Sequence, residues 1–387
     1  GTPAVQVAAL AELFAARQRF PVEVLAFDLE FRVHFYRGDS DAYRVTLRQL
    51  EALGRAGVRH HVGYWALLLS EGRRGVAQAS AEGFALAPRN HVQAYQLAQI
   101  YLELGFFDKA DSVLSRATET MGWIAGTVML HSEVLTNARA WDRLRSLALR
   151  LRGNSGDMES PSGFAYYLEG VSSWHQGDMR AARRSFERMA RLGLGDPKVA
   201  LRVATGLLRL DAVSYAERIL LPHREAQGEN IEYLRLLNDC AVRLKNDSYL
   251  LNVAAVLYAL QPNDVRTAIN WAAALVIFRQ QPDTAIILTR QLYADHPEDR
   301  GIVDNHIGAL LLNRRVDEAE ELLDRIDPNR LGVTSKAKYL LLKFEAQLQR
   351  GRLTEARAVA TQITKSELFP VQVRWLEDRV RKLPKAP

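Results

Sequence analysis

The amino-acid sequence predicts an all-α fold built from tandem helix pairs, and three observations lead to this prediction. Ala, Leu, Arg, Glu and Gln are abundant, and apolar residues recur at spacings of three and four, as they do on one face of a helix. Sustained apolar/polar alternation, the sign of half-buried strands, is missing from the sequence. Short polar or Gly-containing turns recur at close intervals. With 387 residues, 48% of them hydrophobic, the chain is not a disordered one.

Residues 94–122 form the clearest helix pair. A first helix ends at Gly105, a residue typical of helix C-termini. Ala98 and Ala110 stand where two antiparallel helices must approach closely, because a larger side chain would separate them. The segment 166–191 repeats these offsets, with its first small residue, its turn and its second small residue at Gly170, Gly177 and Ala182.

The same template places ten turns along the chain. They are expected near Gly38, Gly72, Gly105, Arg139, Gly177, Asp211, Lys245, Gln280, Arg314 and Gly351. The intervals are 34, 33, 34, 38, 34, 34, 35, 34 and 37 residues. The longest one contains a Gly/Ser/Pro-rich insertion at 152–163. Two units also carry a proline that stops the second helix, Pro262 and Pro297.

This pattern resembles the tetratricopeptide repeat (TPR) family. The family's unit is a 34-residue helix–turn–helix with a small residue in the first helix, Gly at the turn, Ala and a bulky apolar residue in the second helix, and Pro at the end. The resemblance covers roughly residues 20–365 and is strongest around Gly105, Gly177 and Gln280.

The resemblance implies a right-handed α-solenoid of about ten repeats, because stacked neighbours bury jointly the apolar face that one repeat cannot bury alone. We expect a single superhelix over residues 1–387. It would have an N-terminal capping helix within 1–20, tandem repeats over 21–369 with the loop insertion at 152–163, and a C-terminal capping helix with a basic tail over 370–387.

In this family the first helices of successive units line a concave groove that binds peptides or partner helices. The resemblance therefore implies a set of groove-facing candidates: Gln99, Tyr167, Trp174, Lys198, Arg202, Arg235, Asp239, Arg243 and Asn270. Each of them is also compatible with an ordinary solvated helix position. Aromatic residues two turns apart, such as Tyr167 and Trp174, are more often part of the core.

The family's two-carboxylate clamp, which grips the C-terminus of a peptide, is not expected here. Lys198 and Arg202 match its last pair of residues. The two preceding units, however, offer Met129, Glu133 and Leu168, and Glu133 would repel a carboxylate.

The positive charge is concentrated at one end of the chain. The formal net charge is +6, but residues 335–387 alone carry twelve basic and five acidic groups, a net of +7. The remaining residues are close to neutral, which disfavours a nucleic-acid groove along the molecule. The basic end is compatible with an acidic partner or an anionic membrane surface, and equally with the polar capping helix that repeat proteins need for solubility.

Signatures of catalysis, metal binding or cofactor binding are not found in the sequence, so we expect no enzyme activity and no cofactor. His60, His61 and His91 suggest a metal site only weakly, because adjacent histidines on a helix point in different directions. The carboxylates around Glu320 fit a solvated helix face with ion-paired neighbours. The single cysteine, Cys240, is expected to be a small packed residue.

The function that fits these features is a non-catalytic protein-interaction scaffold that binds a peptide or protein in the groove. Arginine exceeds lysine 42 to 9, which favours a bacterial source, and such arrays serve in multi-protein assemblies, including those of the cell envelope. Two alternatives stay open: a helical-repeat RNA binder, similar to the pentatricopeptide family, and a regulatory module of an enzyme.

The compartment is left open between cytoplasm and periplasm. Apolar runs are too short to span a bilayer. The sequence begins Gly1-Thr2-Pro3, so an anchor or signal segment could precede it.

Overall fold

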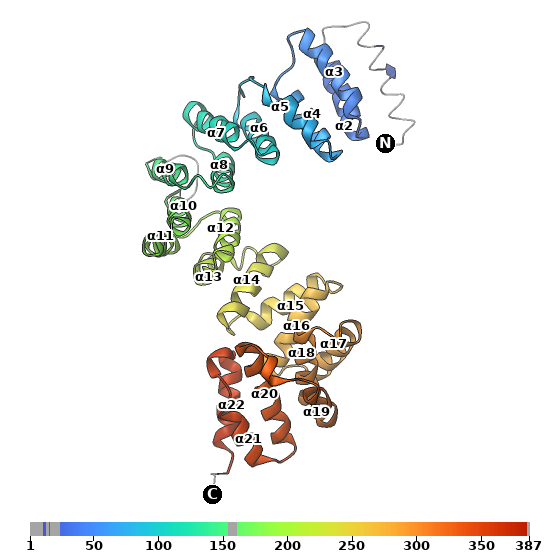
Figure 1. Ribbon diagram of the computed structural model, residues 1–387, viewed down its shortest axis with the longest axis vertical. Helices are drawn as coiled ribbons and strands as arrows, with labels where there is room; N and C mark the ends of the chain where they lie inside the picture. Colours follow the sequence, from blue (N-terminus) through green and yellow to red (C-terminus); the bar gives the residue numbers. More distant parts are fainter. Residues whose placement is uncertain (1–10, 13–14, 16–23, 154–160, 385–387) are drawn as a thin grey trace. The chain divides into compact units, whose positions relative to one another are not determined.

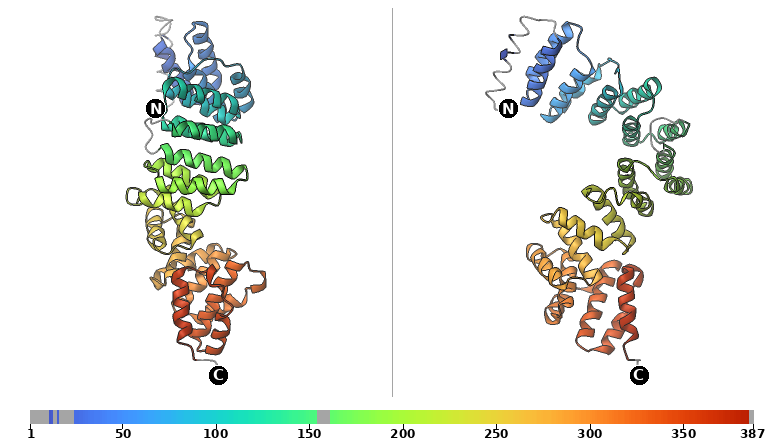
Figure 2. Two further views of the ribbon diagram at one scale, coloured as in Figure 1. Left: turned by 90° about the vertical axis from the view of Figure 1, so that its left-hand side faces the viewer. Right: turned by 180° about the vertical axis from the view of Figure 1, so that it is seen from behind.

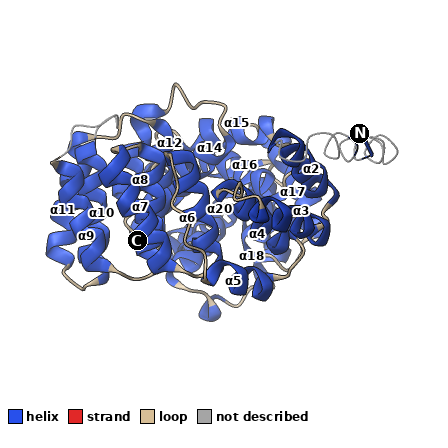
Figure 3. Cartoon of the chain, turned by 90° about the horizontal axis from the view of Figure 1, so that it is seen from above, coloured by secondary structure: helices blue, strands red, loops and turns tan. Residues whose placement is uncertain are grey.

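The computed structural model describes residues 11–12, 15, 24–153 and 161–384. Within these residues every regular element is a helix and no strand occurs (Figure 3). The predicted all-α class is therefore confirmed. The chain divides into two compact units, residues 1–194 and 195–387, and each is described by itself. The expected N-terminal capping helix and most of the insertion at 152–163 lie outside the described residues.

The first unit is a stack of five helix pairs (Figure 1). The pairs are α2 (Val24–Arg37) with α3 (Ser40–Ala52), α4 (Val58–Ser70) with α5 (Arg74–Glu82), α6 (His91–Leu104) with α7 (Phe107–Met121), α8 (Ala125–Asn137) with α9 (Trp141–Arg152), and α10 (Pro161–His175) with α11 (Met179–Leu192).

The second unit contains five more pairs and a final helix (Figure 2). The pairs are α12 (Pro197–Arg209) with α13 (Val213–Leu220), α14 (Ile231–Leu244) with α15 (Leu250–Leu260), α16 (Val265–Phe278) with α17 (Pro282–Asp295), α18 (Arg300–Leu312) with α19 (Val316–Asp324), and α20 (Val333–Gln349) with α21 (Leu353–Ala360). The final helix is α22 (Pro370–Arg381), and three short 3₁₀ turns are η1 (Leu221–His223), η2 (Pro328–Arg330) and η3 (Lys365–Glu367).

The turns inside the helix pairs share the same backbone geometry. The first helix ends in a residue with positive φ, and the next residue donates its N–H to the carbonyl five positions earlier, at 2.8 to 3.1 Å. This bond satisfies a carbonyl that the helix end would leave unpaired. Nine of the ten predicted turn residues have positive φ. The tenth prediction, Gln280, is displaced by one residue, because Arg279 ends α16 in the left-handed conformation.

Small residues set the distance between helices, as the sequence predicts. Ala98 and Ala110 are completely buried. A Cβ atom on Gly170 would lie 2.3 Å from the ring of Phe186, which is too close for any real contact. Large side chains fill the remaining core on both sides of these close approaches, for example Trp65.

No helix within the described ranges has both the length and the apolar content needed to span a membrane.

Candidate functional site

The first helices of the pairs line one face of each unit. Neighbouring first helices contact each other directly, α4 with α6 and α6 with α8 in the first unit, and α16 with α18 and α18 with α20 in the second. Within each unit, each second helix contacts the first helix of the next pair. The outer surface of the first helices of a unit is here called the first-helix face of that unit.

Three groove candidates lie in the first unit. Gln99 is exposed on α6. Tyr167 and Trp174 are half-buried on α10, and their rings pack against Phe164 at 5.8 Å and Phe186 at 6.4 Å between centroids. The two aromatic residues therefore contribute to the core as well as to the surface of α10.

The other six candidates lie in the second unit. Lys198 and Arg202 are exposed and one turn apart on α12, and Arg235 and Arg243 are exposed on α14. Asp239 on α14 and Asn270 on α16 are half-buried. Helices α12 and α14 contact each other, so the first five of these side chains belong to two neighbouring helices.

Arg235 and Arg243 connect neighbouring pairs. The Arg235 guanidinium donates to Gln261 Oε1 at 2.8 Å and to Asp264 Oδ2 at 3.0 Å. Arg243 donates to Asp239 Oδ2 at 3.4 Å and also pairs with Asp211 in the preceding turn. These two arginines have structural partners, which limits what they can offer to a ligand.

The Arg243–Asp211 pair is one of several ion pairs whose two residues are about one repeat apart in the sequence. Arg73 pairs with Asp41, Arg143 with Asp111 at 2.6 Å, and Arg350 with Asp317, each across 32 or 33 residues. Opposite charges about one repeat apart were a signal in the sequence that could have identified these partners.

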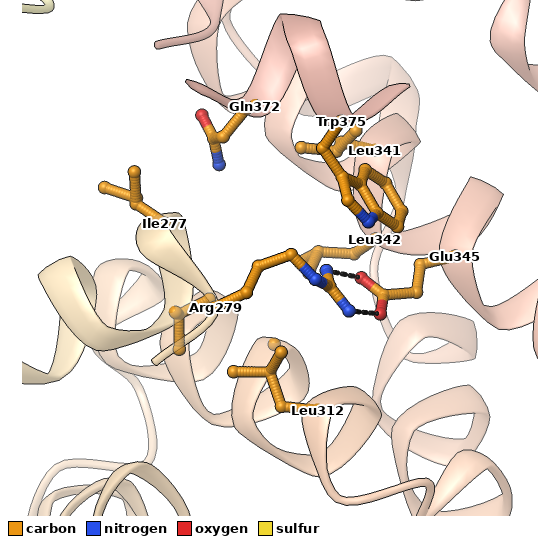
Figure 4. Close-up of a pocket in the computed structure, with 10 residues that line it drawn as sticks. Ile277, Arg279, Leu312, Leu341, Leu342, Glu345, Gln372 and Trp375 are labelled. Carbon is orange, nitrogen blue, oxygen red and sulfur yellow. Dashed lines mark hydrogen bonds and ion pairs between the residues drawn. The ribbon is translucent and has the colours of Figure 1, made fainter. Parts of the chain in front are cut away.

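Sequence reasoning missed a partly buried ion pair on the second-unit face (Figure 4). Arg279, at the end of α16, forms a two-pronged ion pair with Glu345 of α20, with one bond of 2.8 Å between Nη1 and Oε2. The Glu345 side chain is only 7% exposed. The guanidinium also lies 4.4 Å from the ring centre of Trp375 on α22. Such fork-shaped pairing and stacking hold a guanidinium in one orientation.

A pocket surrounds this ion pair. Its apolar wall is formed by residues of three first helices and α22, among them Ile277, Leu312 and Leu341, and Gln372 closes one side (Figure 4). A neighbouring cavity of about 540 Å³ shares Arg279, Leu312, Glu345 and Trp375 with it. A pocket with apolar walls around two mutually paired charges can accommodate a side chain of a ligand. It offers neither a nucleophile nor an unpaired base for catalysis.

Helix α22 lies on this first-helix face. It contacts α16 as well as α21, and Arg374 Nη2 reaches Asp247 Oδ2 in the α14–α15 turn at 3.0 Å. Just before α22, Glu367 accepts from Lys245 Nζ at 3.1 Å. The segment predicted to hold a C-terminal helix and a basic tail, 370–387, thus contains a helix over 370–381 that reaches back to earlier pairs.

Much of the basic character of the C-terminal end is neutralised by ion pairs. Arg350, Arg352, Lys365, Arg374 and Lys382 each pair with a carboxylate. Because these partners occupy the charges, the structure gives less support to an anionic membrane surface than the sequence does.

The remaining candidates for chemistry have ordinary surroundings. His60 contacts Asp28 at 2.9 Å, and His91 contacts the Met121 carbonyl at 3.0 Å. Within the described part of the chain, no three metal-binding side chains come together. Cys240 is completely buried, and burial raises the pKa of its thiol to about 12, so the thiolate nucleophile is not formed at neutral pH.

Comparisons with known proteins concern the fold. No family model and no curated protein matches the chain. Among solved structures, a tetratricopeptide repeat protein from Parabacteroides merdae shares 13% identity, with a TM-score of 0.38, 75% of this chain covered and 100% of that one.

Two solved complexes resemble this chain about as much as that repeat protein does. One is Naa15/Naa10 bound to HypK-THB, with 11% identity, a TM-score of 0.37, and coverage of 96% of this chain and 62% of that one. The other is the APC/C hetero-tetramer Cut9-Hcn1, with 13% identity, a TM-score of 0.36, and coverage of 84% and 72%.

Proposed function

We propose that the chain is a non-catalytic scaffold that binds a peptide or a helix of a partner protein on its first-helix face. The observation that supports this most directly is the position of α22, which lies on the first-helix face of the second unit. A surface that holds one helix of this chain has the shape and the contacts to hold a helix from elsewhere. The stacked pairs are ordered before binding, so little ordering entropy opposes association.

The excess of arginine over lysine favours a bacterial source, and by analogy with other arrays of this kind the scaffold would belong to a multi-protein assembly, with the cell envelope as one setting. Within the second unit, Lys198 and Arg202 on α12 are exposed groove candidates. They lie apart from the part of the face that α22 covers.

Site-specific photo-cross-linking tests this proposal in cells in which the chain is native. A photoreactive phenylalanine analogue would replace Arg202 or Gln99 on first helices, and Arg290 or Arg183 on second helices as exposed controls. We expect discrete protein adducts from the first two positions and none of the same mass from the controls. Equal adducts from all four positions, or adducts removed by ribonuclease rather than by protease, would contradict the scaffold.

A further inference from the structure

Helix α22 covers the first-helix face of α16, α18 and α20 through a small set of contacts (Figure 4). Trp375 stacks on Arg279, and Arg374 pairs with Asp247. The next residue, Leu376, is buried and lines a different pocket, together with Ala360 and Ile363. The two side chains that α22 offers to this face are therefore an aromatic ring and a cation.

Few residues of α22 itself are buried. Of its twelve residues only Leu376 is buried, although Leu368, Phe369 and Leu383 on either side of the helix are buried as well, whereas the neighbouring α20 buries eight of seventeen. The Arg374 side chain is 67% exposed, so its ion pair with Asp247 contributes little in water. Segments with few buried contacts open at much lower free energy than the rest of a fold.

The fit of α22 is also incomplete. The indole N–H of Trp375 is buried and finds no acceptor in the described part of the chain. A buried donor without an acceptor weakens the docked state. The cavity of about 540 Å³ lies beside this ring, between Arg279, Glu345 and Trp375. A helix with a better-matched aromatic side chain would therefore gain contacts that α22 does not make.

We propose that this face is the binding site for a helix of a partner protein, and that α22 is its built-in competitor. The proposal rests on the scaffold function and specifies the partner for this part of the face. The partner is an amphipathic helix that carries Arg or Lys followed directly by an aromatic residue, as α22 does at Arg374 and Trp375. It binds by displacing α22. Its apparent affinity for the chain therefore equals its affinity for the open face multiplied by the fraction of molecules in which α22 is released.

A peptide of residues 369–384, labelled with fluorescein, is the probe for this competition. Its affinity for the full chain would be measured by fluorescence anisotropy for the wild type and for Arg374→Glu. The substitution replaces this weak ion pair by repulsion between two carboxylates, which raises the fraction of molecules in which α22 is released and leaves the face intact. We expect the variant to bind the peptide three- to tenfold more tightly than the wild type does.

Two controls separate this effect from a general change of charge. Arg381→Glu alters the same helix at an exposed residue that has no carboxylate ion pair among the described residues and does not line the cavity beside Trp375. This variant should bind the peptide no more tightly than the wild type does. A peptide with Trp375→Ala, which cannot stack on Arg279, should bind the Arg374→Glu chain at least tenfold more weakly. Equal affinity of wild type and Arg374→Glu, or of both peptides, overturns the proposal.

Hydrogen exchange on the unmodified chain gives an independent measure. Amides of α22 should exchange at least tenfold faster than those of α20. Identical protection of the two helices would mean that α22 opens only with the whole unit, which also overturns the proposal. A dimer of Arg374→Glu that excludes the peptide would assign the face to a second copy of this chain instead. None of these results bears on cross-links from Arg202 or Gln99, so the scaffold function is tested separately.

Discussion

Replacing Arg314 by glycine should stabilise the second unit, because Arg314 has a backbone conformation that glycine adopts with less steric strain. Its φ is 58°, and its exposed side chain makes no hydrogen bond or ion pair with the described residues. A left-handed L-residue costs about 1–2 kcal/mol. The extra freedom of glycine in the unfolded chain costs about 0.5–1 kcal/mol. The difference is a gain of about 0.5–1 kcal/mol in the free energy of unfolding.

The other non-glycine turns extend this reasoning, because their side chains differ. Arg139 has a φ of 53° and an exposed side chain, so Arg139→Gly should give the same gain in the first unit. Asp211 and Lys245 have similar φ values, but their side chains pair with Arg243 and Glu367. Glycine at those two turns also removes an ion pair worth up to about 1 kcal/mol, so the net gain should vanish.

Urea unfolding followed by circular dichroism at 222 nm measures these differences. Arg314→Ala is the matched control, because alanine removes the same side chain atoms beyond Cβ and keeps the strained φ; it should change stability by less than about 0.3 kcal/mol. Gly105→Ala is the reverse experiment. Its φ is 85° with no atom within 4 Å of an added Cβ, so its loss of about 0.5–1 kcal/mol is torsional. Equal stabilities of the Gly and Ala variants at 314 would refute the reasoning.

Three further predictions concern packing, the buried ion pair and pH. Gly170→Ala should lower the free energy of unfolding by about 1–3 kcal/mol by pushing Phe186, whereas Gly126→Ala, which meets open space, should cost nothing in the same urea titration. Glu345→Gln should cost about 1–2 kcal/mol by thermal unfolding, and the exposed equivalent Glu321→Gln under about 0.5 kcal/mol. Burial lowers the pKa of His61 to about 4, below its unfolded value of about 6.5, so the unfolded chain binds more protons between these values. Stability should therefore fall by about 2 kcal/mol as the pH drops from 6.5 to 4, and His61→Gln should lose this part of the pH dependence in urea titrations at several pH values.

The repeat could be read from the sequence because its turns are local. A helix end, a left-handed residue and the first residues of the next helix lie within a few positions, so spacing alone predicts them. The prediction at Gln280 is off by one in a turn that contains two residues with positive φ, Arg279 on one side and Gln281 on the other. The other glycine-free turns contain a single such residue, and the spacing places each of them correctly.

The site was less predictable because it depends on contacts between distant segments. Counting from the turns identifies which positions of a first helix face outward, but not which of them already have partners. Arg235 and Arg243 both have partners within the chain. The partner of Arg243 could have been recognised in the sequence, because Asp211 lies 32 residues earlier, about one repeat away. Arg279 and Glu345 are 66 residues apart, and Trp375 belongs to no repeat. No periodic signal connects these three residues.

The difference between local contacts and contacts of distant segments also bears on how binding to the chain could be regulated. In a stack of repeats each pair contacts only its neighbours, so a change in one pair fades along the chain. Helix α22 departs from this rule, because Arg374 contacts Asp247 across 127 residues. Docking or release of α22 therefore changes the surroundings of α16, α18 and α20 in one step. A partner that competes with one helix of twelve residues would thereby alter a face built from three repeats.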